Sequence, residues 1–453
     1  MSVNRRDFMS ASALAGLGAV LGSQVGPSGY GATFAAPIAP DENDPNDPNA
    51  ITDPDKEIGK PYAGWKEGDL DLHFIATGSS ENMFYVFPDG TTMLLDCGDR
   101  DYEHYKEATP VTPDNSRRPG EWVARYIKRV RPDVDAIDYV MASHFHDDHV
   151  GNGKFGAGMT TGRSPNYQIS GIAHVGEFYR FGTAFDRGYP NYDRPTTWAP
   201  GGTRKNLLKF WEYKEKTAGL KREEFIVGAL DQIKLLNSPE KYDFHVRNLT
   251  ANGVVWGGEG KENVDFFALN PENYKQQNEN TRSIAILLSY GPFRYYTGGD
   301  ASGSLLDASG NAADYEGAVG RAAGPVDVCK SNHHSYRDAM PRTFTDAVDA
   351  RVYVTCVWDR WHLQDNTETS MVLDEQGKPK AKLVCPTAVH SGNAEMMKDK
   401  AWRARLVERG GHVVVKAYDG GAKYKVYYLT SKDESMNVEL VFGPFASKKA
   451  RNA

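Results

Sequence analysis

Residues 144–149 limit what this chain can be more than any other segment. They place three imidazoles and a carboxylate at the spacing His-x-His-x-Asp-His, directly after an apolar run that predicts a buried strand. His144 and His146 lie two residues apart and can point the same way where the strand ends, so they can share one metal ion. Asp148 and His149 follow in the turn and can reach a second ion about 3.5–4 Å away. Imidazole and carboxylate bind zinc, manganese and iron, so the segment predicts a metal site.

This segment, preceded by Ile-Asp-x-Val and followed by Val-Gly, resembles the signature of the metallo-β-lactamase-fold hydrolases. The resemblance implies an α/β fold, a four-layer αββα sandwich in which two mixed sheets pack face to face with helices outside. It also implies that the site lies at one edge of the sandwich, where strand-end loops of both halves meet. The resemblance covers about residues 68–430 and is poorest in the midsection.

The N-terminal segment, residues 1–36, predicts an export signal rather than part of the fold. Residues 4–9 carry a twin-arginine pattern, residues 11–21 are apolar but too short for a convincing membrane span, and small residues near position 36 suit cleavage. The segment resembles the twin-arginine signals of bacterial exported proteins. That implies the twin-arginine export machinery as a partner, a periplasmic or extracellular location, and no stable membrane span after cleavage. A basic tail beside a chance apolar run is the alternative.

The composition is that of an ordinary globular protein. The 453 residues are 40% hydrophobic and 25% charged, which is long and apolar enough for a large core. A net charge of −7 gives no support for general nucleic-acid binding, and the four cysteines have no metal-type spacing. We predict a flexible linker over residues 37–66 and a metallo-β-lactamase-fold domain over residues 67–446, with an elaborated midsection at about 190–262.

The start of the domain predicts three strands, over residues 69–75, 83–87 and 91–95, followed by an amphipathic helix over residues 121–131. Asp96 ends the third strand. In the family that the chain resembles, an Asp at this place lies at the edge of the site and holds the ligands in position rather than binding metal strongly. A solvated Asp in a turn is the alternative.

The second half repeats the pattern of a strand followed by polar residues. A strand over residues 293–297 runs into a Gly-Gly-Asp turn that ends at Asp300, and an Asp there can bridge two metal ions with its two oxygens. Asp300 matches the bridging Asp of the family. A later strand is followed by His333 and His334, which match its last metal histidine. One of the two should bind the second metal ion and the other should face the substrate; we expect His334 at the metal ion and His333 at the substrate, and the reverse is the alternative.

The His-His pair resembles two branches of the family, the extracytoplasmic nuclease-type branch linked to DNA uptake and the phosphocholine-esterase branch. Those branches usually carry Gly after the pair, and Ser335 departs from that pattern. His362 loosely matches a His after the next strand in the nuclease-type branch, and a packed or surface His is the alternative. Tyr336 and Arg337 are candidates to hold a substrate anion, since a guanidinium offers a planar fork suited to phosphate or carboxylate.

One ligand that the family often provides has no obvious counterpart. A later His usually completes the first metal position, and His174 is a candidate, but it lies in a segment, residues 169–181, that predicts a helix and would point its side chain by packing. The number of metal ions therefore stays open. Aromatic and basic residues of the midsection either shape a substrate mouth or belong to core and solvated surface. They are Trp198, Arg204, Trp211 and Tyr213.

Together these residues predict a binuclear metal-dependent hydrolase. The ligands are His144, His146, Asp148, His149, Asp300 and His334. Two divalent ions are expected, zinc in the first instance, with manganese or iron as alternatives. A water bridging them can lose its proton near neutral pH and attack phosphorus or carbon, with Asp148, His333 and His362 as catalytic residues.

The expected substrate is a small molecule carrying a phosphoester, or a phosphodiester. A lactone or cyclic-amide (β-lactam-like) hydrolase using the same site is one alternative, and an iron-dependent redox enzyme is another. A non-catalytic binding module is a third, although that class typically loses the ligands that this chain keeps. The sequence does not fix the substrate, the metal or the oligomeric state.

Overall fold

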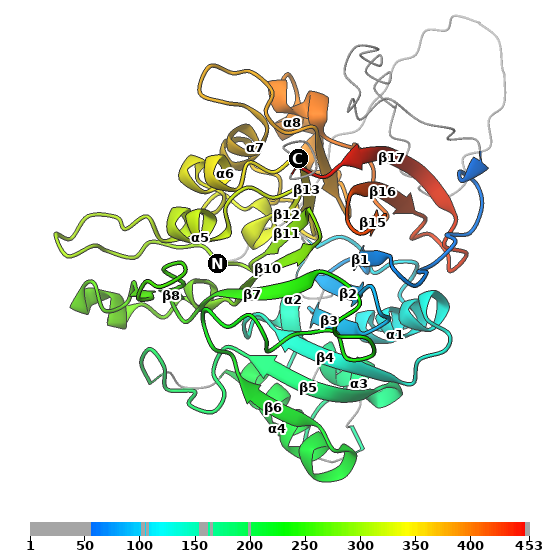
Figure 1. Ribbon diagram of the computed structural model, residues 1–453, viewed down its shortest axis with the longest axis horizontal. Coiled ribbons are helices and arrows are strands. Elements are labelled where there is room, and N and C mark those ends of the chain that lie inside the picture. The colour runs from blue at the N-terminus through cyan, green and yellow to red at the C-terminus, as the bar shows by residue number, and fades with distance from the viewer. Residues whose placement is uncertain are drawn as a thin grey trace, which may run out of the picture. The chain divides into compact units, whose positions relative to one another are not determined.

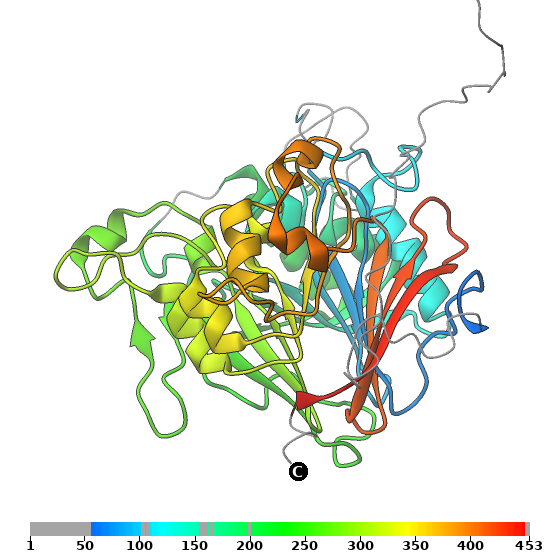
Figure 2. The same ribbon diagram turned by 90° about the horizontal axis from the view of Figure 1, so that it is seen from above.

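Two β-sheets pack face to face and are covered by helices on both outer sides (Figure 1, Figure 2). The computed structural model describes residues 56–100, 105, 108–153, 162–163, 166–197 and 201–448. The predicted export signal, residues 1–36, and most of the predicted linker lie outside these ranges. Among the residues that the structure describes, no helix has both the length and the apolar character needed to cross a membrane.

The first sheet has nine strands within the described ranges. Their order is β17-β16-β15-β1-β2-β3-β4-β5-β6, antiparallel from β17 to β3 and parallel from β3 to β6. The bounds are β1 Leu70–Phe74, β2 Asn82–Val86, β3 Thr92–Cys97, β4 Ala136–Ala142, β5 Arg180–Asp186, β6 Lys221–Glu224, β15 His412–Tyr418, β16 Lys423–Leu429 and β17 Val438–Ala446.

The second sheet has eight strands in the same part of the chain. Their order is β14-β13-β12-β11-β10-β7-β8-β9, parallel from β14 to β11 and antiparallel from β11 to β9. The bounds are β7 Phe244–Ala251, β8 Val254–Val255, β9 Val264–Asp265, β10 Ala285–Tyr290, β11 Phe293–Thr297, β12 Val328–Lys330, β13 Val352–Thr355 and β14 Leu383–Pro386.

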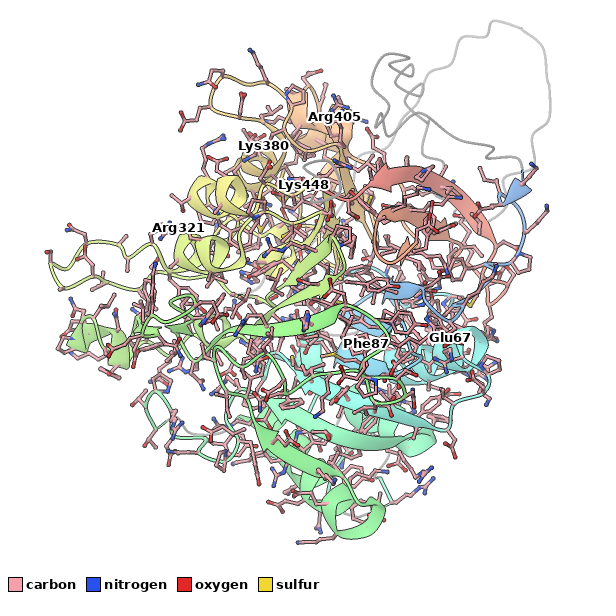
Figure 3. The ribbon with its side chains drawn as sticks, viewed as in Figure 1. Glu67, Phe87, Arg321, Lys380, Arg405 and Lys448 are labelled. Carbon is pink, nitrogen blue, oxygen red and sulfur yellow. The ribbon has the colours of Figure 1, made fainter. Side chains whose placement is uncertain are left out.

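The alternation of side chains along each strand separates the core into layers. In β2, Met83 and Tyr85 point into the core between the two sheets, whereas Phe84 points outward to the helices. Phe87, which follows β2 and is labelled in Figure 3, packs on Phe244 of the second sheet with 4.6 Å between ring centroids. Because both faces of the strand are covered, all five residues of β2 are buried.

Helices of the first half cover the first sheet, and helices of the second half cover the second. The first set is α1 Pro119–Val130, α3 Ile172–Phe178 and α4 Gly202–Ala218; the second is α5 Tyr315–Ala323, α6 Arg342–Val348 and α7 Asp365–Val372. Charged residues such as Arg321 on α5 lie on the outer surface of these helices (Figure 3). This layering confirms the predicted αββα fold class.

Two elements refine the sequence prediction. The sequence of residues 393–409, which is followed by Gly410-Gly411, predicts one helix, and the structure has a shorter one: α8 Asn393–Met397 ends, Asp399 takes the left-handed conformation, and a 3-10 helix, η5 Ala401–Arg405, follows. The midsection contributes to both sheets, since β6 extends the first and β7 and β8 belong to the second. Asn252-Gly253 is a residue pair that predicts a β-hairpin, and the structure confirms it: both residues have positive φ and lie between β7 and β8.

Candidate metal centre

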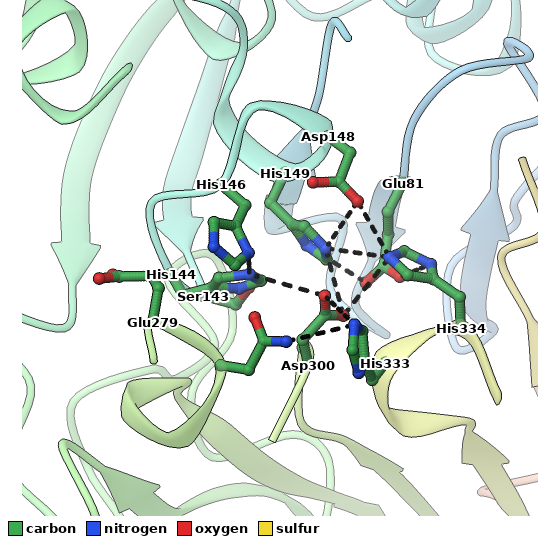
Figure 4. Close-up of polar contacts among 12 residues, drawn as sticks. Glu81, Ser143, His144, His146, Asp148, His149, Glu279, Asp300, His333 and His334 are labelled. Atoms are coloured by element: carbon green, nitrogen blue, oxygen red, sulfur yellow. Dashed lines mark hydrogen bonds and ion pairs between the residues drawn. The ribbon is translucent and has the colours of Figure 1, made fainter. Parts of the chain in front are cut away.

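Three strand ends bring the predicted ligands into one cluster, in which all but the partly exposed His146 are buried (Figure 4). The end of β4 leads into the His-x-His turn and α2 Asp147–Val150, the end of β11 leads into the Gly-Gly-Asp turn, and the end of β12 leads into the 3-10 helix η4 Asn332–Ser335. The side chains that meet there are His144, His146, Asp148, His149, Asp300 and His334.

Asp300 lies between two groups of nitrogen donors, with one carboxylate oxygen toward each. Its Oδ2 is 3.6 Å from His144 Nε2, and His144 Nε2 is in turn 3.0 Å from His146 Nδ1. Its Oδ1 is 3.2 Å from His149 Nε2 and 3.5 Å from His334 Nε2. We call His144, His146 and Asp300 Oδ2 the first group.

The second group consists of Asp300 Oδ1, Asp148, His149 and His334. His149 and His334 turn their Nε2 atoms toward each other at 3.2 Å, and Asp148 Oδ2 lies 3.2 Å from His334 Nε2 and 3.6 Å from His149 Nε2. All four residues are buried. Two carboxylates and two imidazoles thus converge on one point.

This donor set fits divalent metal ions. In each group two ring nitrogens face each other within hydrogen-bond distance, and such an arrangement is satisfied by a cation held between them. Asp300 Oδ1 is buried and has no hydrogen-bond partner among the described residues. An orphaned carboxylate oxygen facing imidazole nitrogens has the chemistry of a metal ligand.

The ionisation of His144 and Asp300 agrees with that use. Burial and the neighbouring His149 hold the pKa of His144 well below its ordinary value, so this imidazole is neutral and has a lone pair to offer. Burial opposes charge on Asp300, yet the imidazoles of His149 and His334 hold the pKa of this carboxyl well below its usual range. Asp300 is therefore ionised. Burial opposes charge on His149 and His334, yet Asp300 and Asp148 raise the pKa of His149 well above its ordinary value and that of His334 to about 9, so a metal ion bound here would displace protons from these rings.

Hydrogen bonds to the outer ring nitrogens aim the imidazoles at the centre. His149 Nδ1 donates to Asp96 Oδ2 at 2.9 Å, and His334 Nδ1 donates to the carbonyl of Cys356 at 2.8 Å. The hydroxyl of Ser143 lies 3.1 Å from His144 Nδ1 and itself donates to Asp96 Oδ2 at 2.6 Å. Each bond leaves the Nε2 atom free for a ligand. The structure thus places Asp96 beside the ligands, and it adds Ser143, which the sequence did not single out.

A buried ion pair supports the second group from outside. Glu81 and Lys330 are both fully buried, with 2.7 Å between Nζ and the carboxylate, and Nζ also donates to the carbonyl of Gly299 at 2.7 Å. Glu81 lies 3.4 Å from His334 Nδ1 and 3.9 Å from His149 Nδ1, which are the nitrogens that point away from the centre. Its position supports the ligands rather than completing their set. A lysine in a buried strand is the sequence signal that predicts such a counter-ion.

The paired histidines occupy an unusual stretch of backbone. His333, His334 and Ser335 have φ values of 44°, 51° and 60°, in the left-handed region that favours glycine. His333 Nδ1 donates to Asp338 at 2.6 Å, and its Nε2 lies 3.9 Å from Asp300 Oδ2. With its side chain 20% exposed, His333 lies at the open side of the cluster, whereas His334 is buried within it.

The remaining predicted residues surround this core at different depths. Tyr336 packs on His333 with 5.2 Å between ring centroids, and the exposed Arg337 lies over Tyr336. His362 is buried and stacks in parallel on His334 at 4.6 Å, while its Nδ1 accepts the backbone N–H of Trp358. His362 therefore lies behind a ligand and not at the open side.

His174 is not brought to the centre. It lies on α3, where its ring packs on Phe178 and its side chain faces Gly120 of α1. Burial lowers the pKa of His174 to about 4. As its predicted helical position implies, packing determines the direction of its side chain, and it contacts none of the ligands.

Of the midsection residues, Trp211 is fully buried in the core, and Trp198 lies outside the described residues.

Arg100 is a cation beside the centre that the sequence did not reveal. Its guanidinium lies over the rings of Tyr105 and Trp358, at 4.4 and 4.9 Å from their centroids, and these two rings contact each other edge to face. One nitrogen is 3.2 Å from Asp147 and 3.9 Å from Asp148. Its side chain is 29% exposed, so a fixed positive charge borders the second group and can be reached from solvent.

Comparison with known proteins agrees with this geometry. Residues 76–157 match the Metallo-beta-lactamase superfamily model. That stretch includes the His-x-His-x-Asp-His segment, so this part of the chain is similar to that superfamily. No curated protein matches the sequence. A solved structure of a mutant of the CmlA beta-hydroxylase is similar at 12% identity with a TM-score of 0.33, over 63% of this chain and 45% of that one. The chain thus spans less than half of that hydroxylase.

Proposed function

We propose that this protein is a binuclear metal-dependent hydrolase that acts on a phosphoester or phosphodiester. The observation that carries the proposal is the placement of Asp300, whose two oxygens face two separate groups of imidazoles at 3.6 and 3.2 Å. A carboxylate so placed can hold two divalent ions side by side. A single-metal site has no need for the second set of donors.

In this proposal His144, His146 and Asp300 hold the first ion, and Asp300, Asp148, His149 and His334 hold the second. When bound, two such ions supply a hydroxide near neutral pH and stabilise negative charge on the group under attack. Asp96, Ser143 and the carbonyl of Cys356 keep the imidazoles in the required tautomer.

The residues at the open side support a phosphate-bearing substrate. Arg100 lies over two aromatic rings beside Asp148, and Arg337 lies on the surface beyond Tyr336. A guanidinium binds phosphate oxygens through paired hydrogen bonds, which matches the predicted substrate class. His333, whose Nδ1 donates to Asp338, is partly exposed beside Asp300 and can contact a bound substrate.

We also propose that the protein is exported by the twin-arginine route. Arg5 and Arg6 carry the pattern, and this route moves proteins that are already folded. Export after folding lets the buried ligands take up metal in the cytoplasm. Replacing both arginines with lysine should keep the protein in the cytoplasm, as cell fractionation would show. Unchanged export would remove this part of the proposal.

Metal analysis is the decisive experiment for the catalytic proposal. The wild-type protein, purified without added metal, is compared with His146→Ala and with the control His245→Ala. His245 is an exposed residue of β7 beside Asp243. Wild type and His245→Ala should contain two equivalents of zinc or manganese and hydrolyse bis(p-nitrophenyl) phosphate. His146→Ala should have less metal and little activity.

Other outcomes would reject defined parts of the proposal. A wild-type protein without metal would reject the metal centre. One equivalent of iron would reject the binuclear hydrolase. Two equivalents of metal without turnover of generic phosphomonoesters and phosphodiesters would reject the substrate class alone.

A further inference from the structure

The two groups of donors are unequal in number. The second group offers two imidazoles and two carboxylates, whereas the first offers two imidazoles and Asp300 Oδ2 alone. No further His, Cys, Asp or Glu of the described residues joins His144, His146 and Asp300. A tetrahedral site needs a fourth donor, or three protein ligands and water.

A 3-10 helix borders the first group at this point. This helix, η3 Asn280–Arg282, directly precedes β10. Glu279, just before it, accepts the backbone N–H of Phe145 at 3.1 Å, and Phe145 is the residue between the two histidines of the first group. Glu279 also binds Arg187 through both oxygens, at 2.5 and 2.8 Å, and this ion pair is buried. The start of η3 is thus firmly attached to the His-x-His turn.

Asn280 is fixed in this place with its amide against the site. The residue is 5% exposed, and its Nδ2 donates to His333 Nε2 at 3.2 Å. That ring nitrogen lies 3.9 Å from Asp300 Oδ2, the oxygen that faces the first group. The other end of the amide, Oδ1, is buried and has no hydrogen-bond partner within the described part of the chain. A buried amide oxygen without a partner is costly unless something binds it.

We propose that Asn280 Oδ1 is the missing ligand of the first metal ion. This inference rests on the binuclear site proposed above and deepens it. With Asn280 included, each ion has two imidazole nitrogens and two oxygens. The bond from Nδ2 to His333 gives the amide its orientation, so the same contact that positions the substrate-facing histidine also points Oδ1 at the ion.

The amide makes the two positions chemically different. An amide oxygen is neutral and hard, whereas the second position has a full carboxylate, Asp148, in the matching role. The first position should therefore bind its ion more weakly than the second. It should also favour manganese more than a position with a third imidazole ligand would. Replacing Asn280 with His should shift the preference of this position toward zinc.

The test compares three variants by metal titration and by the absorption spectrum of the cobalt-loaded protein. Asn280→Ala removes the amide, and Asn280→Asp keeps an oxygen at the same place. Asn248→Ala is the matched control, because Asn248 is also buried with Oδ1 unpartnered among the described residues, but its Nδ2 binds the carbonyl of Ile226 in another part of the fold.

We expect Asn280→Ala to keep one tightly bound equivalent and to bind the other at least about tenfold more weakly. The remaining equivalent shows that the variant is folded. Asn280→Asp and Asn248→Ala should bind two equivalents, and the cobalt spectrum should change in the Asn280 variants only. Two equivalents with unchanged affinity in Asn280→Ala would overturn the assignment of Asn280. A wild-type protein that binds no metal would instead overturn the proposed function, and this inference with it.

Discussion

The two metal-binding groups share Asp300 but differ in how firmly the fold holds them. In the second group His149 and His334 are both buried, and the outer nitrogen of each is fixed, by Asp96 at 2.9 Å and by the carbonyl of Cys356 at 2.8 Å. His362 stacks on His334 and adds a further constraint.

The first group is held less rigidly. His144 has its outer nitrogen fixed by the hydroxyl of Ser143, at 3.1 Å, and His146 is half-exposed. A carboxylate or carbonyl partner makes imidazole a better ligand than a hydroxyl does, because it stabilises the N–H more strongly. The comparison teaches that two positions joined by one carboxylate need not have equal affinity, and that the second should fill first.

The largest effect is expected where the two groups meet. Asp300→Asn keeps the shape but removes the charge that both groups share, so the affinity for both ions should fall together and kcat should drop by about 10³-fold or more. Metal titration and steady-state kinetics would measure this. Asp419→Asn, at an exposed Asp paired with Lys423, is the control. Loss of one ion only would show that Asp300 serves one group.

A smaller effect is expected from replacing Asp96, whose carboxylate holds residues of both groups in place through hydrogen bonds. Asp96→Asn weakens the bond to His149 and the bond to Ser143, so the second ion should bind about 10–100-fold more weakly and the first ion should be affected less. Two-step metal titration separates the two affinities. Equal losses at both positions would contradict the difference drawn between the groups.

The pH dependence of stability should report on the loop that carries His334. Burial raises the pKa of Glu316 and of Glu368 to about 8, and these carboxyls hydrogen-bond Asn332 and Ser335 at the two ends of η4. The ordinary pKa is 4.5, so their contribution to stability is fully present below pH 4.5 and is lost as pH rises through about 8. Each unit of difference corresponds to about 1.4 kcal/mol.

The double variant Glu316→Gln/Glu368→Gln should therefore lose less thermal stability than wild type between pH 7 and 9. The buried His73 and His412, whose pKa burial lowers to about 3, act only at lower pH and do not disturb this window. Thermal melts at each pH, with the exposed Glu272→Gln as control, measure the effect. Parallel curves for wild type and the double variant would refute it.

The smallest effect is expected at Ser143. Ser143→Ala removes the hydrogen bond to His144 and the one that the hydroxyl donates to Asp96, but Asp96 keeps its bonds to His149 and to the backbone N–H of residue 143. The first ion should therefore bind more weakly, by about fivefold, the equivalent of about 1 kcal/mol, and the second ion should be unaffected. Two-step metal titration of this variant beside wild type measures the change. Weakening of the second ion would show that the two groups are not separate.

The fold class and most of the cluster can be predicted from sequence because they depend on local patterns. The His-x-His-x-Asp-His segment is contiguous, and Asp300 follows a strand and two glycines. The family resemblance indicates Asp96 as a supporting residue, but the contacts of the supporting residues cannot be predicted in this way. Glu81 meets Lys330, and Asp96 meets His149, only because loops of different strands converge at the edge of the two sheets.

The proposed role of Asn280 also could not be predicted from the sequence. Its residue type is common in turns, so its sequence position carries no metal signal. Its burial, its bond to His333 and its unpartnered oxygen are properties of the folded chain. The choice between His333 and His334 also needed the fold, because adjacent residues become distinct only through the left-handed backbone that separates them.

That backbone has an evolutionary consequence at Ser335. Its φ of 60° is one that glycine adopts freely, and here the hydroxyl compensates by binding Glu368 at 2.5 Å and Thr367 at 2.9 Å. Serine and carboxyl form one unit: without Ser335, the side chain of Glu368 would be a buried acid with no hydrogen-bond donor to it among the described residues. Lineages with glycine at this turn should be free to lose the acid, and those with serine should retain it, so the two positions are expected to change together.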